Sequence, residues 1–227
     1  MFFMIVFIIC FARTGGMILC ETIGEHSKII PLNEVLGWQG MIKKEKNYCI
    51  KLNYYEMRYS KLIEQRKDAK FISLNRDPRD IAASFKGVEQ KGTDARKMLL
   101  GGGDKKDEPY LGAGKQYLAF LAWRKKFETL PNHLILNFED MLLKKQETFE
   151  KVFEFLGMEF EQRVKDFINK YVSNDPVKDY PGKPNDNRPY RAFSVSPNKK
   201  IGSYKDILSK REIWKINSMF PKSEHVS

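Results

Sequence analysis

The sequence predicts a single α/β domain with a central parallel β-sheet flanked by helices. Short apolar runs rich in Ile, Val and Phe alternate with segments of helical periodicity, an alternation typical of the α/β class. Glycine or Asn-Arg-Asp-Pro turns close the clearest of these runs. At 227 residues the chain is long enough for one well-buried domain and too short for two full-sized ones. We therefore treat residues 1–227 as one domain.

Residues 1–12 form an almost wholly apolar run, which we interpret as a buried first strand. The run is shorter than the ~20 residues that a membrane helix needs. It also lacks the basic n-region and the small-residue cleavage site of a signal peptide. It leads directly into Arg13-Thr14-Gly15-Gly16, a turn that suits the end of a strand. We therefore expect no membrane span in this chain.

The later elements follow from the same periodicities. Further strands are predicted at residues 29–32, 48–52, 70–74 and 133–138. Helices are predicted at residues 17–26, 57–66, 79–87, 115–129, 146–156 and 164–171, with a last one around Trp214 and Ile216. Pro78 suits the start of the third of these helices. Trp123 and Trp214 are assigned to the core.

Two long segments show no periodicity and are predicted to be loops. Residues 93–114 include Gly101-Gly102-Gly103 and a run of Asp and Lys, so we expect a mobile surface loop there. Residues 174–200 are rich in Pro, Asn, Asp and Lys, and a loop of this length inside a compact domain is usually functional. We therefore predict that the second loop contacts a cofactor or an acceptor.

The chain is strongly basic. Lys and Arg number 40 against 29 acidic residues, a formal net charge of +11, so the partners are expected to be anionic. Charge alone leaves a polyanion, an acidic membrane and a phosphorylated cofactor open. Cys10, Cys20 and Cys49 have no paired spacing. This predicts neither a disulfide framework nor a metal site and favours a reducing, cytoplasmic compartment.

The first candidate binding motif is Arg13-Thr14-Gly15-Gly16-Met17. A turn between a strand and a helix gathers unpaired backbone N–H groups around one point, which suits a phosphate. Arg13 adds a charge and Thr14 a hydroxyl. A nucleoside-triphosphate P-loop would close with Gly-Lys-Ser/Thr, but Met17 follows Gly16 here, which disfavours magnesium-dependent hydrolysis. Ordinary loop geometry is the alternative interpretation.

The second candidate motif runs from Arg76-Asp77-Pro78-Arg79-Asp80 to Ser84. Arg76 ends a predicted strand, and Ser84 lies one helical segment later. Both side chains are therefore expected to converge on one phosphate. A surface cluster of salt bridges at a helix start would show the same alternation of Arg and Asp. The presence of the first turn in the same chain favours the phosphate.

Together these motifs resemble the sulfotransferase superfamily, with a layout nearest to its tyrosylprotein and carbohydrate branch. In that family the loop after the first strand binds the 5′-phosphosulfate of 3′-phosphoadenosine 5′-phosphosulfate (PAPS). An Arg-x-Pro-Arg-Asp-x-x-x-Ser element binds its 3′-phosphate. The resemblance implies a P-loop-NTPase-like sulfotransferase fold, with cofactor contacts from the first turn and from Arg76 and Ser84. The first turn departs from the family in having no hydroxyl after its glycine, so backbone N–H groups would carry more of the binding.

The resemblance continues toward the C-terminus. Residues 136–141 look like the family's strand before its last core helices, and residues 153–157 like the helix after it. Residues 196–205 are similar to the family's second 3′-phosphate loop. The cofactor contacts implied there are Ser196, Asn198, Lys199, Lys200, Ile201 and Gly202. Phe138 is at a position that is often aromatic in relatives and is expected near the adenine, a core aromatic being the alternative.

The resemblance also implies catalytic residues. Sulfuryl transfer needs a base for the acceptor hydroxyl and a cation for the charge that grows on the bridging phosphate oxygen. Glu34 and Lys51 are the candidates, with Arg13 beside the phosphosulfate. Golgi tyrosylprotein and some carbohydrate sulfotransferases resemble this chain at Glu34, and the tyrosylprotein group also does so at Lys51. An exposed loop carboxylate and a solvent-facing lysine on an edge strand are the alternatives.

The implied function is transfer of a sulfuryl group from PAPS to a carbohydrate, tyrosyl or small-molecule hydroxyl, without a metal or a nucleic-acid partner. An anionic acceptor would match the basic charge. A small-molecule P-loop kinase is one alternative, but it requires a lysine after the turn glycine. A non-catalytic basic module for anions or nucleic acid is another, and it requires aromatics interleaved with Lys and Arg on one surface. A truncated Golgi-type domain is the alternative to a cytoplasmic enzyme.

Overall fold

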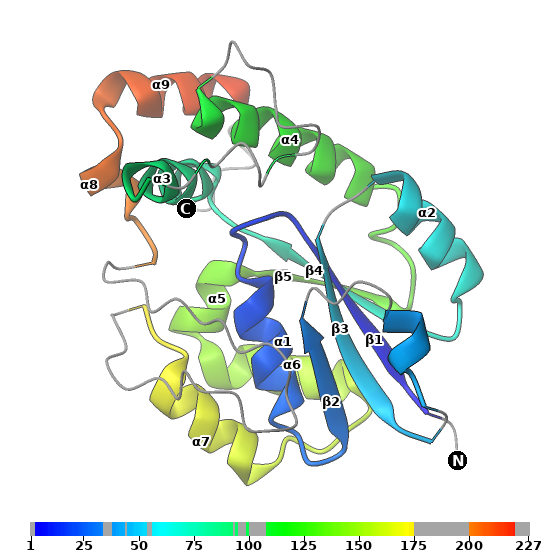
Figure 1. Ribbon diagram of the computed structural model, residues 1–227. Coiled ribbons are helices and arrows are strands. Elements are labelled where there is room, and N and C mark those ends of the chain that lie inside the picture. The colour runs from blue at the N-terminus through cyan, green and yellow to red at the C-terminus, as the bar shows by residue number, and fades with distance from the viewer. Residues whose placement is uncertain are drawn as a thin grey trace.

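The computed structural model describes residues 3–33, 38–43, 45–53, 56–92, 94, 99, 108–174 and 200–220. Their strands form one five-stranded sheet in the order β2-β3-β1-β4-β5, and every neighbouring pair is parallel (Figure 1). The strands are β1 (Ile5–Cys10), β2 (Ile29–Asn33), β3 (Asn47–Asn53), β4 (Lys70–Asn75) and β5 (His133–Asn137). The predicted α/β class with a central parallel sheet is confirmed.

The central strand, β1, is buried along its whole length. Val6 and Ile8 pack into the core on one face of the sheet, while Phe7 and Ile9 pack into the core on the other. A strand covered on both faces must be apolar at every position, which is why the first run of the sequence is continuous rather than alternating. Each of these side chains contributes about 1.5–3 kcal/mol by its burial.

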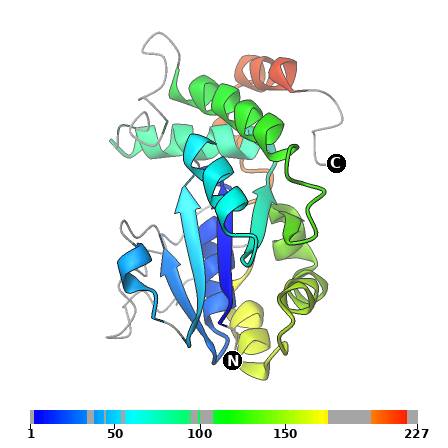
Figure 2. The same cartoon turned by 90° about the vertical axis from the view of Figure 1, so that its right-hand side faces the viewer.

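Helices cover both faces of the sheet, as Figures 1 and 2 show. One core contains residues of α1 (Gly16–Gly24), α5 (Phe138–Leu143), α6 (Lys145–Leu156) and α7 (Gln162–Tyr171). The other contains residues of α2 (Glu56–Gln65), α3 (Pro78–Gln90), α4 (Pro109–Arg124) and α9 (Lys210–Met219). A 3₁₀ turn, η1 (Trp38–Met41), and the single turn α8 (Tyr204–Ile207) complete the described elements. No helix in these ranges has both the length and the hydropathy needed to cross a bilayer.

The predicted loop at 93–114 is wrong in its last six residues, because α4 begins at Pro109. Proline suits the first helical position, where its missing N–H is not needed. Two glycines in these six residues have a packing role. A Cβ on Gly112 would lie 3.1 Å from Leu99 Cδ1, and one on Gly114 would lie 3.3 Å from Met219 Sδ. Most of the remainder of that loop lies outside the described residues.

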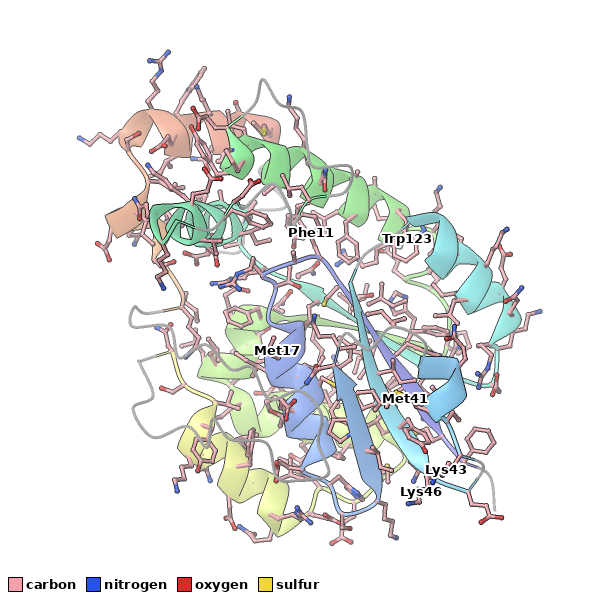
Figure 3. All side chains as sticks on the ribbon, in the orientation of Figure 1. Phe11, Met17, Met41, Lys43, Lys46 and Trp123 are labelled. Carbon is pink, nitrogen blue, oxygen red and sulfur yellow. The ribbon has the colours of Figure 1, made fainter. Side chains whose placement is uncertain are left out.

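Two other aromatic residues differ from expectation. Phe138 was predicted to end a strand, but β5 stops at Asn137 and Phe138 is the first residue of α5. Trp214 was assigned to the core, yet it is 68% exposed, because α9 turns Ile216 rather than Trp214 toward the core. Trp123 is buried as predicted, and its Nε1 donates to Ser60 Oγ at 2.9 Å where α4 meets α2 (Figure 3).

One ion pair joins α9 to α3 and makes stability depend on pH. Lys86 Nζ lies 2.8 Å from both Glu212 carboxylate oxygens, and the Ser209 N–H donates to the same carboxylate at 2.7 Å. Burial alone would raise the pKa of Glu212, but the Lys86 and Ser209 hydrogen bonds outweigh it and lower that pKa to about 2. The ionised carboxylate therefore stabilises the folded chain.

Because the folded pKa lies below the usual value of 4.5, this stabilisation is present above that value and is lost as the pH falls toward 2. We predict that Glu212→Gln is less stable than wild type at pH 6, and that the gap narrows progressively toward pH 3. Urea unfolding followed by circular dichroism at several pH values measures it, with Glu147→Gln, an exposed acid on α6, as the control. A gap that stays constant over this range would contradict the assignment.

Candidate functional site

The two predicted phosphate motifs meet at the carboxyl ends of β1 and β4, which are neighbours in the sheet. The helix after β1, α1, packs on one face of the sheet, while the helix after β4, α3, packs on the other. The connections that leave these two neighbouring strands thus diverge to opposite faces, and α/β sheets bind ligands at such a point. The sheet order therefore brings together two motifs that are separated by about sixty residues in the sequence.

Arg13, Arg76 and Ser84 are linked by hydrogen bonds. Arg76 donates from one terminal nitrogen to the Arg13 carbonyl at 2.6 Å. Arg13 Nε donates to Ser84 Oγ at 2.8 Å. The sequence predicted that Arg76 and Ser84 converge, and in the structure Arg13 lies between them. These bonds link two arginines and a hydroxyl at the carboxyl ends of β1 and β4, an arrangement that suits a dianionic group.

The first turn has an unusual backbone. Arg13 and Gly15 both have positive φ angles, 67° and 95°, which glycine tolerates and arginine rarely adopts. Thr14 is fully buried, and its hydroxyl donates to the Phe11 carbonyl at 2.7 Å. Its hydrogen therefore closes the turn rather than facing solvent. A phosphate here would rely on the N–H groups at the start of α1, where Met17 lies (Figure 3).

Both glycines of this turn are needed for close packing. A Cβ on Gly15 would lie 2.3 Å from Phe138 Cδ2, and one on Gly16 would lie 2.3 Å from Cys10 Sγ. The turn is therefore held between β1 and the start of α5. The Cβ placed on Gly16 would also lie 3.1 Å from Lys51 Cε. The end of the Lys51 side chain therefore lies beside the turn.

Lys51 lies on β3, between β2 and β1 in the sheet. It is only 5% exposed, so the alternative of a solvent-facing lysine on an edge strand is wrong. A buried ammonium requires partners or a ligand because desolvation opposes its charge. The structure thus brings Lys51 together with the first turn, as the sequence predicted. Glu34 lies outside the described residues.

The Arg76 side chain of the second motif is also buried, at 9% exposure. A second terminal nitrogen donates to the Lys200 carbonyl at 2.6 Å, and Cζ lies 4.3 Å from the Phe138 ring centroid. Burial lowers the pKa of Arg76, while the charges of Asp80 and Glu139 oppose this shift. Its Nε finds no acceptor among the described residues. A buried donor without a partner is costly and marks a place where an anion would be stabilised.

Acidic side chains organise the second motif. Asp77 caps α3 by accepting from the Arg79 N–H at 2.8 Å, and it also forms an ion pair with the Arg79 side chain. The Asp77 N–H donates to Glu139 Oε1 at 2.9 Å. Burial raises the pKa of Glu139, and the hydrogen bonds from the Asp77 N–H and from its own backbone N–H partly oppose that shift. Glu139 was not among the predicted site residues, although an acid directly after a predicted strand is a signal of such a role.

Residues 200–202 belong to the segment that resembles the family's second 3′-phosphate loop, and they lie against the second motif. Besides the Lys200 carbonyl, which contacts Arg76, the Gly202 N–H donates to Asp80 Oδ2 at 2.8 Å. Asp80 is 1% exposed, and it was not among the predicted site residues. Ile201 is half-buried beside them. The other predicted contacts of this loop, Ser196, Asn198 and Lys199, lie outside the described residues.

Phe138 was predicted to lie near an adenine. It is 1% exposed, and it packs between Gly15 and the Arg76 guanidinium. This contact supports the position of Arg76, and a role toward adenine stays a prediction. In the described ranges no cluster of three or more His, Cys, Asp or Glu side chains has a metal-binding arrangement.

Comparison with known proteins identifies the family. A profile of the sulfotransferase domain matches residues 55–224. The chain belongs to the sulfotransferase family. The superfamily predicted from the motifs is thereby confirmed. This sulfotransferase is 30% identical over 185 residues to sulfotransferase 2A6 of Rattus norvegicus, an alignment that covers 76% of this chain and 61% of the relative. The chain thus spans less than two thirds of that relative.

Solved structures agree on the fold. Mouse sulfotransferase SULT7A1 complexed with PAP superposes with a TM-score of 0.67 at 16% identity, over 96% of this chain and 84% of that one. Retinol dehydratase in complex with androsterone and the inactive cofactor PAP gives 0.53 at 17% identity, over 95% and 79%. At these identities the likeness concerns the fold, and it matches the sheet and helix layers described above.

The packing of the first turn yields a prediction that needs no ligand. Gly16→Ala is expected to destabilise this sulfotransferase by about 1–3 kcal/mol, because its Cβ would overlap Cys10 Sγ. Gly87→Ala is the matched control, since nothing lies within 4 Å of its Cβ, and in the helix α3 it is expected to stabilise by about 0.5–1 kcal/mol. Urea unfolding followed by circular dichroism measures both. Equal stability of Gly16→Ala and wild type would contradict the packing described for the turn.

Proposed function

We propose that this sulfotransferase transfers a sulfuryl group from PAPS to an acceptor hydroxyl. The observation that carries the proposal is the Arg76 guanidinium, which is buried, lacks an acceptor for Nε within the described residues and lies beside Arg13 and Ser84. A 3′-phosphate would supply the missing acceptor and two negative charges. PAP, or 3′-phosphoadenosine 5′-phosphate, is what remains of PAPS after the sulfuryl group has left. Its presence in the structures of mouse SULT7A1 and retinol dehydratase supports the choice of nucleotide.

The opposite end of the nucleotide is assigned to the first turn. The N–H groups at the start of α1 have no preceding helical turn to accept them, and the positive end of the helix dipole favours an anion there. Lys51 lies against this turn at Gly16. The donors at the turn and the cations at Arg76 thus form two anion sites on neighbouring strands, as a nucleotide with phosphates at both its 3′ and 5′ positions requires.

PAPS supplies an activated sulfuryl group when it is bound. During the transfer a bond forms between the acceptor oxygen and sulfur while the bond between sulfur and the bridging phosphate oxygen breaks. Lys51 is proposed to neutralise the negative charge that remains on that oxygen. Glu34 is proposed as the base that takes the acceptor proton. It follows Asn33, the residue that pairs with Lys51 in the sheet register.

The rival enzymatic function, a small-molecule P-loop kinase, is disfavoured by Met17 in place of the required lysine and by the family match. The other alternative, a non-catalytic basic module for anions or nucleic acid, requires aromatic side chains interleaved with Lys and Arg on one surface. The match of residues 55–224 to the sulfotransferase domain disfavours that module as well. Carbohydrate, tyrosyl and small-molecule acceptors all stay within the proposal, and a screen of such acceptors with PAPS separates them.

Titration calorimetry tests which nucleotide the protein binds. We expect PAP to bind without magnesium and more tightly than ATP. Arg76→Lys keeps the charge but loses the planar fork that reaches Arg13 and Lys200, so it is expected to weaken PAP at least about tenfold. Lys126→Arg, an exchange at an exposed position, is the control. Absence of PAP binding by wild type, or unchanged affinity in Arg76→Lys, would refute the proposal.

Lys51→Met tests the chemistry. Methionine keeps the buried apolar stem beside Gly16 while removing the ammonium, so the rate of labelled sulfate transfer from PAPS is expected to fall about 10²–10³-fold. PAP affinity is expected to change much less, because the charge matters most when the bridging oxygen becomes anionic. Lys126→Met controls for the loss of one charge. A transfer rate equal to wild type would remove Lys51 from the mechanism.

A further inference from the structure

Residues 76–80 hold a second segment, residues 200–204, against the start of α3. Arg76 donates to the Lys200 carbonyl. The Arg79 guanidinium carbon lies 4.4 Å from the centre of the Tyr204 ring. Asp80 accepts three hydrogen bonds from the last three residues of the segment. The two stretches are separated by more than 120 residues in the sequence, so these contacts fix a long-range junction.

Asp80 makes the largest share of this junction. Its Oδ2 accepts from the Gly202 N–H at 2.8 Å, and its Oδ1 accepts from the Ser203 hydroxyl and the Tyr204 N–H, each at 3.1 Å. The side chain is 1% exposed, so these bonds are made away from water, where a carboxylate needs them most. Gly202 has a φ of 75°, a conformation that allows its own N–H and the donors of Ser203 and Tyr204 to face one carboxylate.

The other end of the segment has a separate anchor. Asn174 Oδ1 accepts from the Lys200 N–H at 3.0 Å and from the Ile201 N–H at 2.7 Å. Asn174 therefore fixes residues 200–201, and Asp80 fixes residues 202–204. Without Asp80, the Lys200 carbonyl that contacts Arg76 would be held from one side only.

A carboxylate beside an anionic ligand is unfavourable unless hydrogen-bond donors or cations of the protein compensate its charge. Asp80 directs its oxygens to residues 202–204, and its charge also opposes the effect of burial on the pKa of Arg76. It thus favours the charged form of the guanidinium and fixes the segment that this guanidinium contacts. Neither effect requires Asp80 to touch a nucleotide.

We infer that Asp80 is a positioning residue that sets the selectivity of this protein for a 3′-phosphorylated nucleotide, by holding residues 200–204 against Arg76. The inference rests on the proposed function, because it assigns the 3′-phosphate to the Arg76 side of the site. It concerns discrimination between nucleotides rather than the transfer step. Loss of Asp80 should therefore affect the part of the affinity that comes from the 3′-phosphate and leave the rest.

PAP and adenosine 5′-phosphate (AMP) test this directly, since they differ only in the 3′-phosphate. In Asp80→Asn, calorimetry is expected to show PAP affinity at least about tenfold lower, with AMP affinity within about twofold of wild type. Asp206→Asn, the same exchange at an exposed position of α8, is expected to keep both affinities. Equal losses for the two nucleotides, or an unchanged preference for PAP, would overturn the inference. Wild type that binds PAP no better than AMP would refute the proposed function as well.

Ser203→Ala is a milder variant that keeps the test decisive if Asp80→Asn fails to fold. It removes one of the three bonds and is expected to lower PAP affinity about fivefold with no change for AMP. Hydrogen exchange of the ligand-free protein is independent of any nucleotide. The amides of Gly202 and Tyr204 should exchange at least about tenfold faster in Asp80→Asn than in wild type. Exchange at the wild-type rate would show that Asp80 does not hold the segment.

Discussion

The buried guanidinium of Arg76 is the interaction on which the rest of the candidate site depends. It donates to the Arg13 carbonyl at the end of β1 and to the Lys200 carbonyl near the C-terminus, and it packs on Phe138 after β5. Its own backbone is held by Tyr117 of α4, whose hydroxyl accepts from the Arg76 N–H at 2.9 Å and donates to its carbonyl at 3.1 Å. Through its side chain and its backbone, Arg76 thus contacts four other parts of the chain.

Holding a charge in this position constrains its surroundings. Burial disfavours the ionised guanidinium, so the acids Asp80 and Glu139 lie close enough to oppose that effect. The acids in turn are used as acceptors for backbone N–H groups, Asp80 at Gly202 and Glu139 at Asp77. Their charge therefore organises the backbone instead of repelling a bound anion. The site is a network in which each charged group also fixes a turn.

Sequence periodicity located the five strands and the two motifs because those signals are local. Its errors have a common cause. Residues 109–114 were predicted to belong to a loop, but they begin α4, and Gly112 and Gly114 allow that helix to approach Leu99 and α9. Trp214 looked like core because it is large and apolar, but the direction of α9 exposes it. In both cases a neighbour distant in the sequence decided the role of the residue.

By itself the sequence determined the parallel α/β class, the turn after the first strand and the Arg76 to Ser84 motif, since hydrophobic runs and turn residues act on adjacent positions. Only the tertiary structure decided that Lys51 is buried between two strands, that the Thr14 hydroxyl faces inward and that Asp80 holds residues 202–204. These facts depend on the order of strands in the sheet and on contacts across more than a hundred residues. No local pattern encodes such contacts, because they arise only when the separated segments pack together.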